Sequence, residues 1–214
     1  MKAELKTRKR CCINRHRRAT PSIARRIATA ASQPRNGESC ATTSNKSTED
    51  KVVRFASLEI HKEEFSFSAG HFTIFSATER EQLHGHNYNV SVSFNKLIQD
   101  NGLSFDYRHY KKKILALCDQ LDRHLLLPDQ SPYLRLEDSG EYWIAHFNNK
   151  KLPFLKEDVI IMPLTNITIE ELSLWFLQKI LEHQQDIECH GIRGISVKVY
   201  NGPGQSGGAC WGSM

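Results

Sequence analysis

Apolar and polar residues alternate in two segments of this 214-residue chain, 63–75 and 86–98. A period of two places successive side chains on opposite faces, which is typical of a β-strand with one buried face. In the second segment, one face carries Tyr88, Val90, Val92 and Phe94. A polar stretch of about ten residues joins the segments, so the pattern predicts an antiparallel hairpin.

Two later segments have the period of a helix. Segment 107–126 repeats apolar residues at this spacing, namely Ile114, Leu117, Leu121 and Leu125. Segment 168–185 also repeats them, and Thr168 at its start is a residue type that caps helices. Both segments therefore predict amphipathic helices, each with one apolar face to bury.

Strands are predicted for most of what remains. Residues 131–163 contain three short apolar runs separated by polar turns, which predict an inserted strand or hairpin excursion between the helices. Residues 191–201 alternate again, and the Gly-rich segment 202–211 leads into a final short strand. This order predicts an α+β domain in which two helices pack on one face of an antiparallel sheet.

The charge of the chain is unevenly distributed. Residues 1–50 carry twelve Lys/Arg and four Asp/Glu, a net of +8, whereas residues 51–214 carry seventeen and twenty, a net of −3. We expect residues 1–55 to be a disordered basic extension, because they have few large apolar residues, and residues 56–214 to form the folded domain. An extension without structural role, an organelle-targeting peptide and a polyanion-binding arm all fit this composition.

Composition also bears on partners and location. A mildly acidic domain argues against nucleic acid as its partner. No apolar run reaches the length of a transmembrane helix, so we expect no membrane partner. The six cysteines form no CxxC pair, and the N-terminus lacks the apolar core of a secretory signal, which together favour reduced thiols and a cytoplasmic location.

Three histidines are candidate metal ligands. His84 and His86 are two residues apart and share one face of a strand, and His71 lies on the predicted partner strand. Three imidazoles from neighbouring strands would leave a fourth tetrahedral position open, as in catalytic zinc sites. From spacing alone, hydrogen-bonded surface histidines in a polar loop are an equal alternative.

The residues around these histidines resemble a known family. The segments FSAGHF (67–72) and LHGHNYNVSVSF (83–94) resemble the 6-pyruvoyl- and 6-carboxy-tetrahydropterin synthases. The resemblance continues in family order over about residues 60–205, through LSFDYRHYKKKI, LDRHLLLP, TNITIEELSLWF and ISVKVYN.

This resemblance implies specific properties for the chain. It implies Zn²⁺ held by His71, His84 and His86, and a tunnelling fold with a four-stranded antiparallel sheet and two helices. It further implies a homohexamer with active sites at subunit interfaces, and 7,8-dihydroneopterin triphosphate as the substrate. A pterin triphosphate would then be the small-molecule partner.

The chain departs from the family where its catalytic cysteine usually lies. The corresponding positions hold Thr78 and Arg80, and an arginine is always protonated and cannot act as a base. Glu81, three residues before His84, is the candidate replacement. The alternative is that Glu81 is an ordinary loop carboxylate.

A second departure concerns the family's Asp-His pair. Here Arg123 separates Asp122 from His124. The resemblance makes Asp122 and His124 catalytic candidates, with His124 as a proton relay. His124 could equally be a solvated residue at a helix C-terminus.

A third departure concerns the residue that anchors the pterin. The family usually has Glu after its last V-x-V-Y run, where this chain has Asn201, and a carboxamide offers one acceptor group instead of two. We expect Asn201, Thr168 and Glu170 to contact the substrate. Glu170 is alternatively a first-turn residue favoured by the helix dipole.

Together with these residues, the resemblance implies a zinc-dependent lyase acting on 7,8-dihydroneopterin triphosphate. Its chemistry would be that of a 6-pyruvoyl- or 6-carboxy-tetrahydropterin synthase, or side-chain cleavage to 6-hydroxymethyl-dihydropterin. Two alternatives stay open, a non-catalytic zinc-binding module of the same fold and a lyase for another heterocycle. Arg80 and Asn201 motivate the first alternative, and Asn201 the second.

Overall fold

Two long antiparallel strands, β1 (Phe55–His71) and β2 (His84–Leu97), contain the alternating segments. The computed structural model describes residues 55–98, 102, 105–182 and 184–213. Along the ladder Phe67 pairs with Tyr88, and their rings stack with centroids 4.9 Å apart. The predicted hairpin is confirmed, although β1 ends at His71 instead of reaching residue 75.

The described residues all belong to one compact unit of the fold, Glu49–Met214. The predicted disordered extension, residues 1–55, lies outside the described residues except for Phe55, which begins β1. Within the described part, no helix combines the length and apolarity needed to cross a membrane.

The sheet contains more strands than the predicted four. In the described residues its order is β7-β3-β1-β2-β8-β9, with β8 (Ile192–Gly202) and β9 (Gln205–Gly212) continuing the antiparallel part. β3 (His124–Pro128) and β7 (Val159–Met162) add two parallel strands beside β1. Their unbroken apolar runs, LLL and VIIM, suit strands covered on both faces, for which no alternating signal is expected.

The first helix is shorter than predicted. α1 (Arg108–Leu121) ends before Asp122, whose backbone is extended, and Arg123 has a φ of 62°. A left-handed residue cannot continue an α-helix. Leu125 and His124 therefore lie in β3 and not in a helix, which corrects the placement of His124 at a helix C-terminus.

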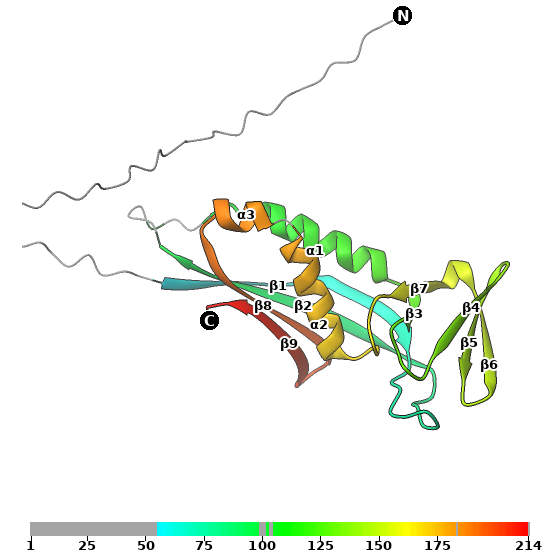
Figure 1. Cartoon of the computed structure of the whole chain (residues 1–214). Coiled ribbons are helices and arrows are strands. Elements are labelled where there is room, and N and C mark those ends of the chain that lie inside the picture. Colours follow the sequence, from blue (N-terminus) through cyan, green and yellow to red (C-terminus); the bar gives the residue numbers. More distant parts are fainter. Residues whose placement is uncertain (1–54, 99–101, 103–104, 183, 214) are drawn as a thin grey trace, which may run out of the picture. The chain divides into compact units, whose positions relative to one another are not determined.

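The helices cover one face of the antiparallel strands, as Figure 1 shows for α1, α2 (Ile169–Leu181) and α3 (Gln184–Cys189). Their buried side chains join the sheet in one apolar core that includes Phe65, Tyr88, Phe94, Ile114, Leu172 and Phe176. The Thr168 hydroxyl accepts a hydrogen bond from the Glu171 N–H at 3.3 Å, which confirms Thr168 as the cap of α2. The predicted α+β arrangement is thus confirmed.

The inserted segment between the helices forms a small sheet of its own. β4 (Arg135–Ser139), β5 (Tyr142–Phe147) and β6 (Lys150–Leu155) pair antiparallel in sequence order, and the 3-10 helix η1 (Lys156–Asp158) leads to β7. This three-stranded sheet lies at one end of the described domain (Figure 1). A second apolar core joins it to the β1–β2 loop and consists of Phe72, Ile74, Leu127, Leu134, Ala145, Phe147 and Val159.

A glycine in β9 permits close contact with the first turn of α2. A Cβ atom on Gly207 would lie 2.5 Å from the backbone carbon of Ile169 and 2.6 Å from the Glu170 nitrogen. Backbone atoms cannot move aside as a flexible side chain can. Gly207 thus lets α2 start directly against the sheet.

We expect Gly207→Ala to lower the free energy of unfolding by about 1–3 kcal/mol, because the new methyl group must displace the start of α2. Gly208→Ala is the matched control, since its Cβ would lie at ordinary contact distances of 3.5 and 3.7 Å from its neighbours. Urea denaturation of both variants measures the effect. Equal midpoints for the two variants would contradict the close approach.

Candidate metal centre and active site

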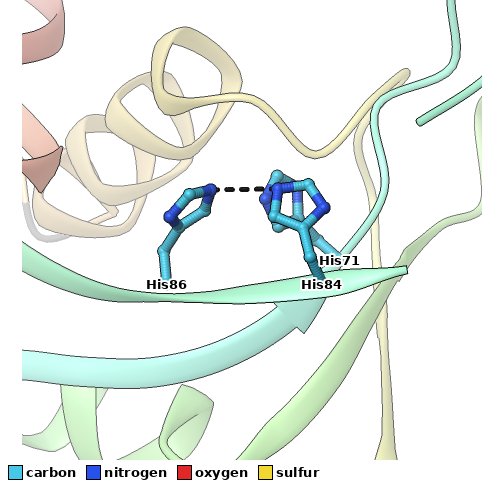
Figure 2. Close-up of side chains that lie close together, drawn as sticks. All are labelled: His71, His84 and His86. Carbon is cyan, nitrogen blue, oxygen red and sulfur yellow. Dashed lines mark hydrogen bonds between the residues drawn. The ribbon is translucent and has the colours of Figure 1, made fainter. Parts of the chain in front are cut away.

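Three imidazoles converge at the turn end of the β1–β2 ladder. His71 pairs with His84 and Ala69 with His86, so the register brings all three rings to one face. Their ligand nitrogens lie within 4.8 Å of one another, and Nε2 of His84 is 3.0 Å from Nε2 of His86. Figure 2 shows the rings turned toward one another above the strands.

Backbone carbonyls orient two of the rings. Nδ1 of His71 donates to the Ile167 carbonyl at 2.9 Å, and Nδ1 of His84 donates to the Gln82 carbonyl at 2.8 Å. Each ring is thereby set in the tautomer whose Nε2 carries a lone pair, and that of His84 accepts a hydrogen bond from Nε2 of His86. A carbonyl partner on the remote nitrogen is the usual arrangement for a metal-ligating histidine.

His71 fits a metal ligand in its burial and protonation. Its Nε2 is buried and has no hydrogen-bond partner, a cost that a bound cation would remove. Burial lowers the pKa of His71, and the nearby His84 and His86 lower it further, against the opposing Ile167 hydrogen bond and Glu81. The imidazole is therefore neutral, as a ligand must be. A three-nitrogen donor set suits zinc.

Glu81 lies close to the histidines and is fixed by Thr73. The Thr73 N–H donates to Oε2 of Glu81 at 3.0 Å, and the Glu81 N–H donates to the Thr73 carbonyl at 2.8 Å. Desolvation raises the pKa of Glu81, but the Thr73 hydrogen bonds outweigh it, together with the attraction that His84 and His71 exert when protonated, so the pKa is lowered. The carboxylate is ionised and can accept a proton near neutral pH.

A cavity of about 240 Å³, named the metal cavity, joins the three histidines and Glu81 to the start of α2 and the β8–β9 turn. It brings together seven of the predicted site residues: His71, Glu81, His84, His86, Thr168, Glu170 and Asn201. The sequence prediction missed Thr73, Phe75, Tyr88, Ile169 and Gln205, which also line it. Thr73 and Tyr88 lie two residues from a ligand histidine, so strand alternation could have identified them. No local pattern indicated Gln205.

Asp122 and His124 lie outside this cavity. Oδ1 of Asp122 accepts a hydrogen bond from the Ser68 N–H at 2.8 Å, and Nδ1 of His124 donates to the Asp122 backbone carbonyl at 2.7 Å. The imidazole therefore contacts the backbone of Asp122 and not its carboxylate. His124 and Arg123 line a separate cavity of about 450 Å³, which also includes His86.

Comparison with known proteins gives a consistent result. The family model for 6-pyruvoyl tetrahydropterin synthase matches residues 59–207. A provisionally named 6-carboxy-5,6,7,8-tetrahydropterin synthase of Methanocaldococcus jannaschii is 31% identical over 148 residues, covering 68% of this chain and 88% of the relative. The chain belongs to the 6-pyruvoyl tetrahydropterin synthase family. It is thus a tetrahydropterin synthase-like lyase with the tunnelling fold of that family.

Solved structures of the 6-pyruvoyl tetrahydropterin synthase family are similar to this chain. The Plasmodium falciparum enzyme matches with a TM-score of 0.70 and 28% identity, covering 74% of this chain and 99% of the other. A Plasmodium vivax enzyme matches with a TM-score of 0.70 and 29% identity, covering 75% and 99%. That protein is described as a catalytic residue mutant in which a glutamate is replaced by alanine.

We expect His86→Ala to abolish tight binding of zinc or cobalt to this member of the 6-pyruvoyl tetrahydropterin synthase family, because two imidazoles are a weak set for either ion. Metal analysis of the purified full-length chain after dialysis measures the loss. The control is His124→Ala, which removes an imidazole outside the metal cavity. Equal metal content in both variants would contradict a three-histidine centre.

Proposed function

We propose that this chain is a zinc-dependent lyase acting on 7,8-dihydroneopterin triphosphate, with Glu81 as its base. The observation that carries the proposal is the shared cavity, in which three histidines and a fixed carboxylate line the same space. A cavity of this kind next to an apolar core suits a small heterocyclic substrate. Family membership supports a pterin as that substrate.

Each cavity residue has a separate task in this proposal. His71, His84 and His86 would hold the zinc, which supplies Lewis-acid polarisation of a substrate oxygen. Glu81 removes a proton from the substrate side chain. The Thr73 N–H holds Oε2 of Glu81, which leaves Oε1 as the proton acceptor. Burial of Tyr88 raises its pKa, so its phenol stays protonated beside the histidines.

Glu81 is the preferred base because the family's cysteine positions hold Thr78 and Arg80. The Plasmodium vivax relative, in which a glutamate is described as catalytic, supports the same assignment. The base serves any of three outcomes, namely departure of triphosphate, formation of a 6-carboxy-tetrahydropterin, or cleavage of the side chain to 6-hydroxymethyl-dihydropterin. Mass spectrometry of the products distinguishes them, and no turnover by the zinc-loaded, assembled chain would refute the proposed function.

We expect Glu81→Gln to lower kcat by about 100-fold or more, because an amide cannot take up the proton, while zinc content is retained. The control is Glu79→Gln, an exposed carboxylate in the same loop, for which we expect unchanged activity. Steady-state assays with metal analysis on the same samples separate the two effects. Full activity of Glu81→Gln would exclude the base role.

We further propose that the active sites lie at subunit interfaces of a homohexamer, as the resemblance to the family implies. Phe75 lines the metal cavity with 57% of its surface exposed, and Leu83 precedes His84 with 52% exposed. Large apolar side chains at these positions support cover by a neighbouring copy. Analytical ultracentrifugation of the full-length chain tests the assembly.

A second candidate, a lyase for another heterocycle, is favoured by Asn201. Asn201 lines the metal cavity together with Gln205, and it also lines a neighbouring cavity of about 610 Å³ with the Gly202–Gly204 turn. Two carboxamides present both donors and acceptors, whereas the amino and ring N–H groups of a pterin require two acceptors. A heterocycle whose edge carries both a hydrogen-bond donor and an acceptor would fit these two carboxamides better.

Asn201→Glu separates the two candidates. With 7,8-dihydroneopterin triphosphate as the natural substrate, we expect this variant to lower KM about tenfold, because a carboxylate accepts both pterin N–H groups in charge-assisted hydrogen bonds. Gln205→Glu is the control for added charge on the same wall. A higher KM for Asn201→Glu would favour the other heterocycle.

A further inference from the structure

Arg80 connects the loop that carries Glu81 to the three-stranded sheet. Its guanidinium carbon lies 4.7 Å from the ring centroid of Phe72, which follows β1, and 5.8 Å from that of Phe147, the last residue of β5. A guanidinium is planar and permanently charged, and it stacks on aromatic faces. The side chain therefore bridges two segments that lie far apart in the sequence.

The same side chain contacts the backbone of Glu81. Nη1 of Arg80 donates a hydrogen bond to the Glu81 carbonyl at 2.6 Å. On the other side of that residue, the Glu81 N–H donates to the Thr73 carbonyl, and Arg80 itself forms a β-bridge with Ile74. Both peptide groups of Glu81 are thus held in place.

Two asparagines hold the rest of the β1–β2 loop. Nδ2 of Asn148 donates to the Thr78 carbonyl at 3.4 Å. The Asn166 amide accepts from the Ile74 N–H at 3.1 Å and donates to the Ile74 carbonyl at 2.8 Å. Asn148 follows β5 directly, so the inserted segment contacts the loop at two points.

We propose that Arg80 is a positioning residue through which the three-stranded sheet holds the carboxylate of Glu81 against the metal cavity. The base role of Glu81 rests on the proposed function, whereas the mechanical link between β5 and the loop does not. Arg80 itself is not among the residues that line the metal cavity. Its charge is directed at the rings of Phe72 and Phe147 and at a carbonyl oxygen, so it acts through Glu81 and not on the substrate.

Steady-state kinetics of the full-length, zinc-loaded chain test this role. We expect Arg80→Met to lower kcat at least about tenfold, since small displacements of a catalytic group are costly, while KM and zinc content change less than about twofold. We expect Phe147→Leu to lower kcat as well. Phe147→Tyr keeps the aromatic ring and is expected to retain kcat. The double variant Arg80→Met/Phe147→Leu is no slower than Arg80→Met, because both changes break one link.

Phe154→Leu is the matched control. Phe154 lies in β6 and packs against the same second core, but Arg80 stacks on Phe72 and Phe147 instead. Its loss weakens packing in the inserted sheet without breaking the link, so we expect kcat to be unchanged. An equal loss of kcat in Phe154→Leu and Phe147→Leu would show general destabilisation and overturn the proposal.

Hydrogen exchange gives a readout that does not depend on activity. The Thr73 N–H donates to the Glu81 carboxylate, so its exchange reports how firmly the carboxylate is held. We expect faster exchange of this amide in Arg80→Met and Phe147→Leu, and parental exchange in Phe154→Leu. If the parent chain turns over no pterin, the proposed function fails, and this exchange still decides the positioning role.

Two results would overturn the proposal. One is an Arg80→Met variant whose kcat and Thr73 amide exchange both equal those of the parent chain. This result would show that the contact between Arg80 and Phe147 plays no role in positioning Glu81. The other is a raised KM at unchanged kcat, which would make Arg80 a substrate contact.

Discussion

The pairing register of β1 and β2 is the constraint on which the site depends. His71 lies opposite His84, and Ala69 lies opposite His86, on the face that also carries Phe67 and Tyr88. A slip of one residue would turn the histidines to the other face and expose the apolar residues that bury this ladder. The apolar core beneath the helices therefore fixes the three-histidine cluster through the same register.

Burial at this face has a chemical consequence. The sheet and the start of α2 exclude water from His71, which leaves its Nε2 without a partner and keeps the imidazole neutral. Backbone carbonyls at Ile167 and Gln82 set the ring orientations from outside the strands. The site is thus prepared for a cation mainly by the fold, and the acidic residues among those that line the cavity are Glu81 and Glu170.

The second apolar core extends into the β1–β2 loop. The core beneath the helices positions the histidines, and the second core contacts the loop through Phe72 and Ile74. The inserted strands β4–β6 contribute to the second core, so a segment remote in sequence from the histidines shapes the loop that carries Glu81. This loop places the carboxylate of Glu81 at the metal cavity.

The sequence by itself determined the pairing of two strands within 63–75 and 86–98, the histidine triad and the amphipathic helices, because a period of 2 or 3.6 is a local property of each segment. Only the tertiary structure decided where α1 ends, that LLL and VIIM become parallel strands, and that Gln205 reaches the metal cavity. It also decided that Asp122 binds the Ser68 N–H, 54 residues away. These features depend on contacts between segments that are distant in the sequence. A local pattern does not show such contacts, because the partner of a buried polar group is set by how the elements pack.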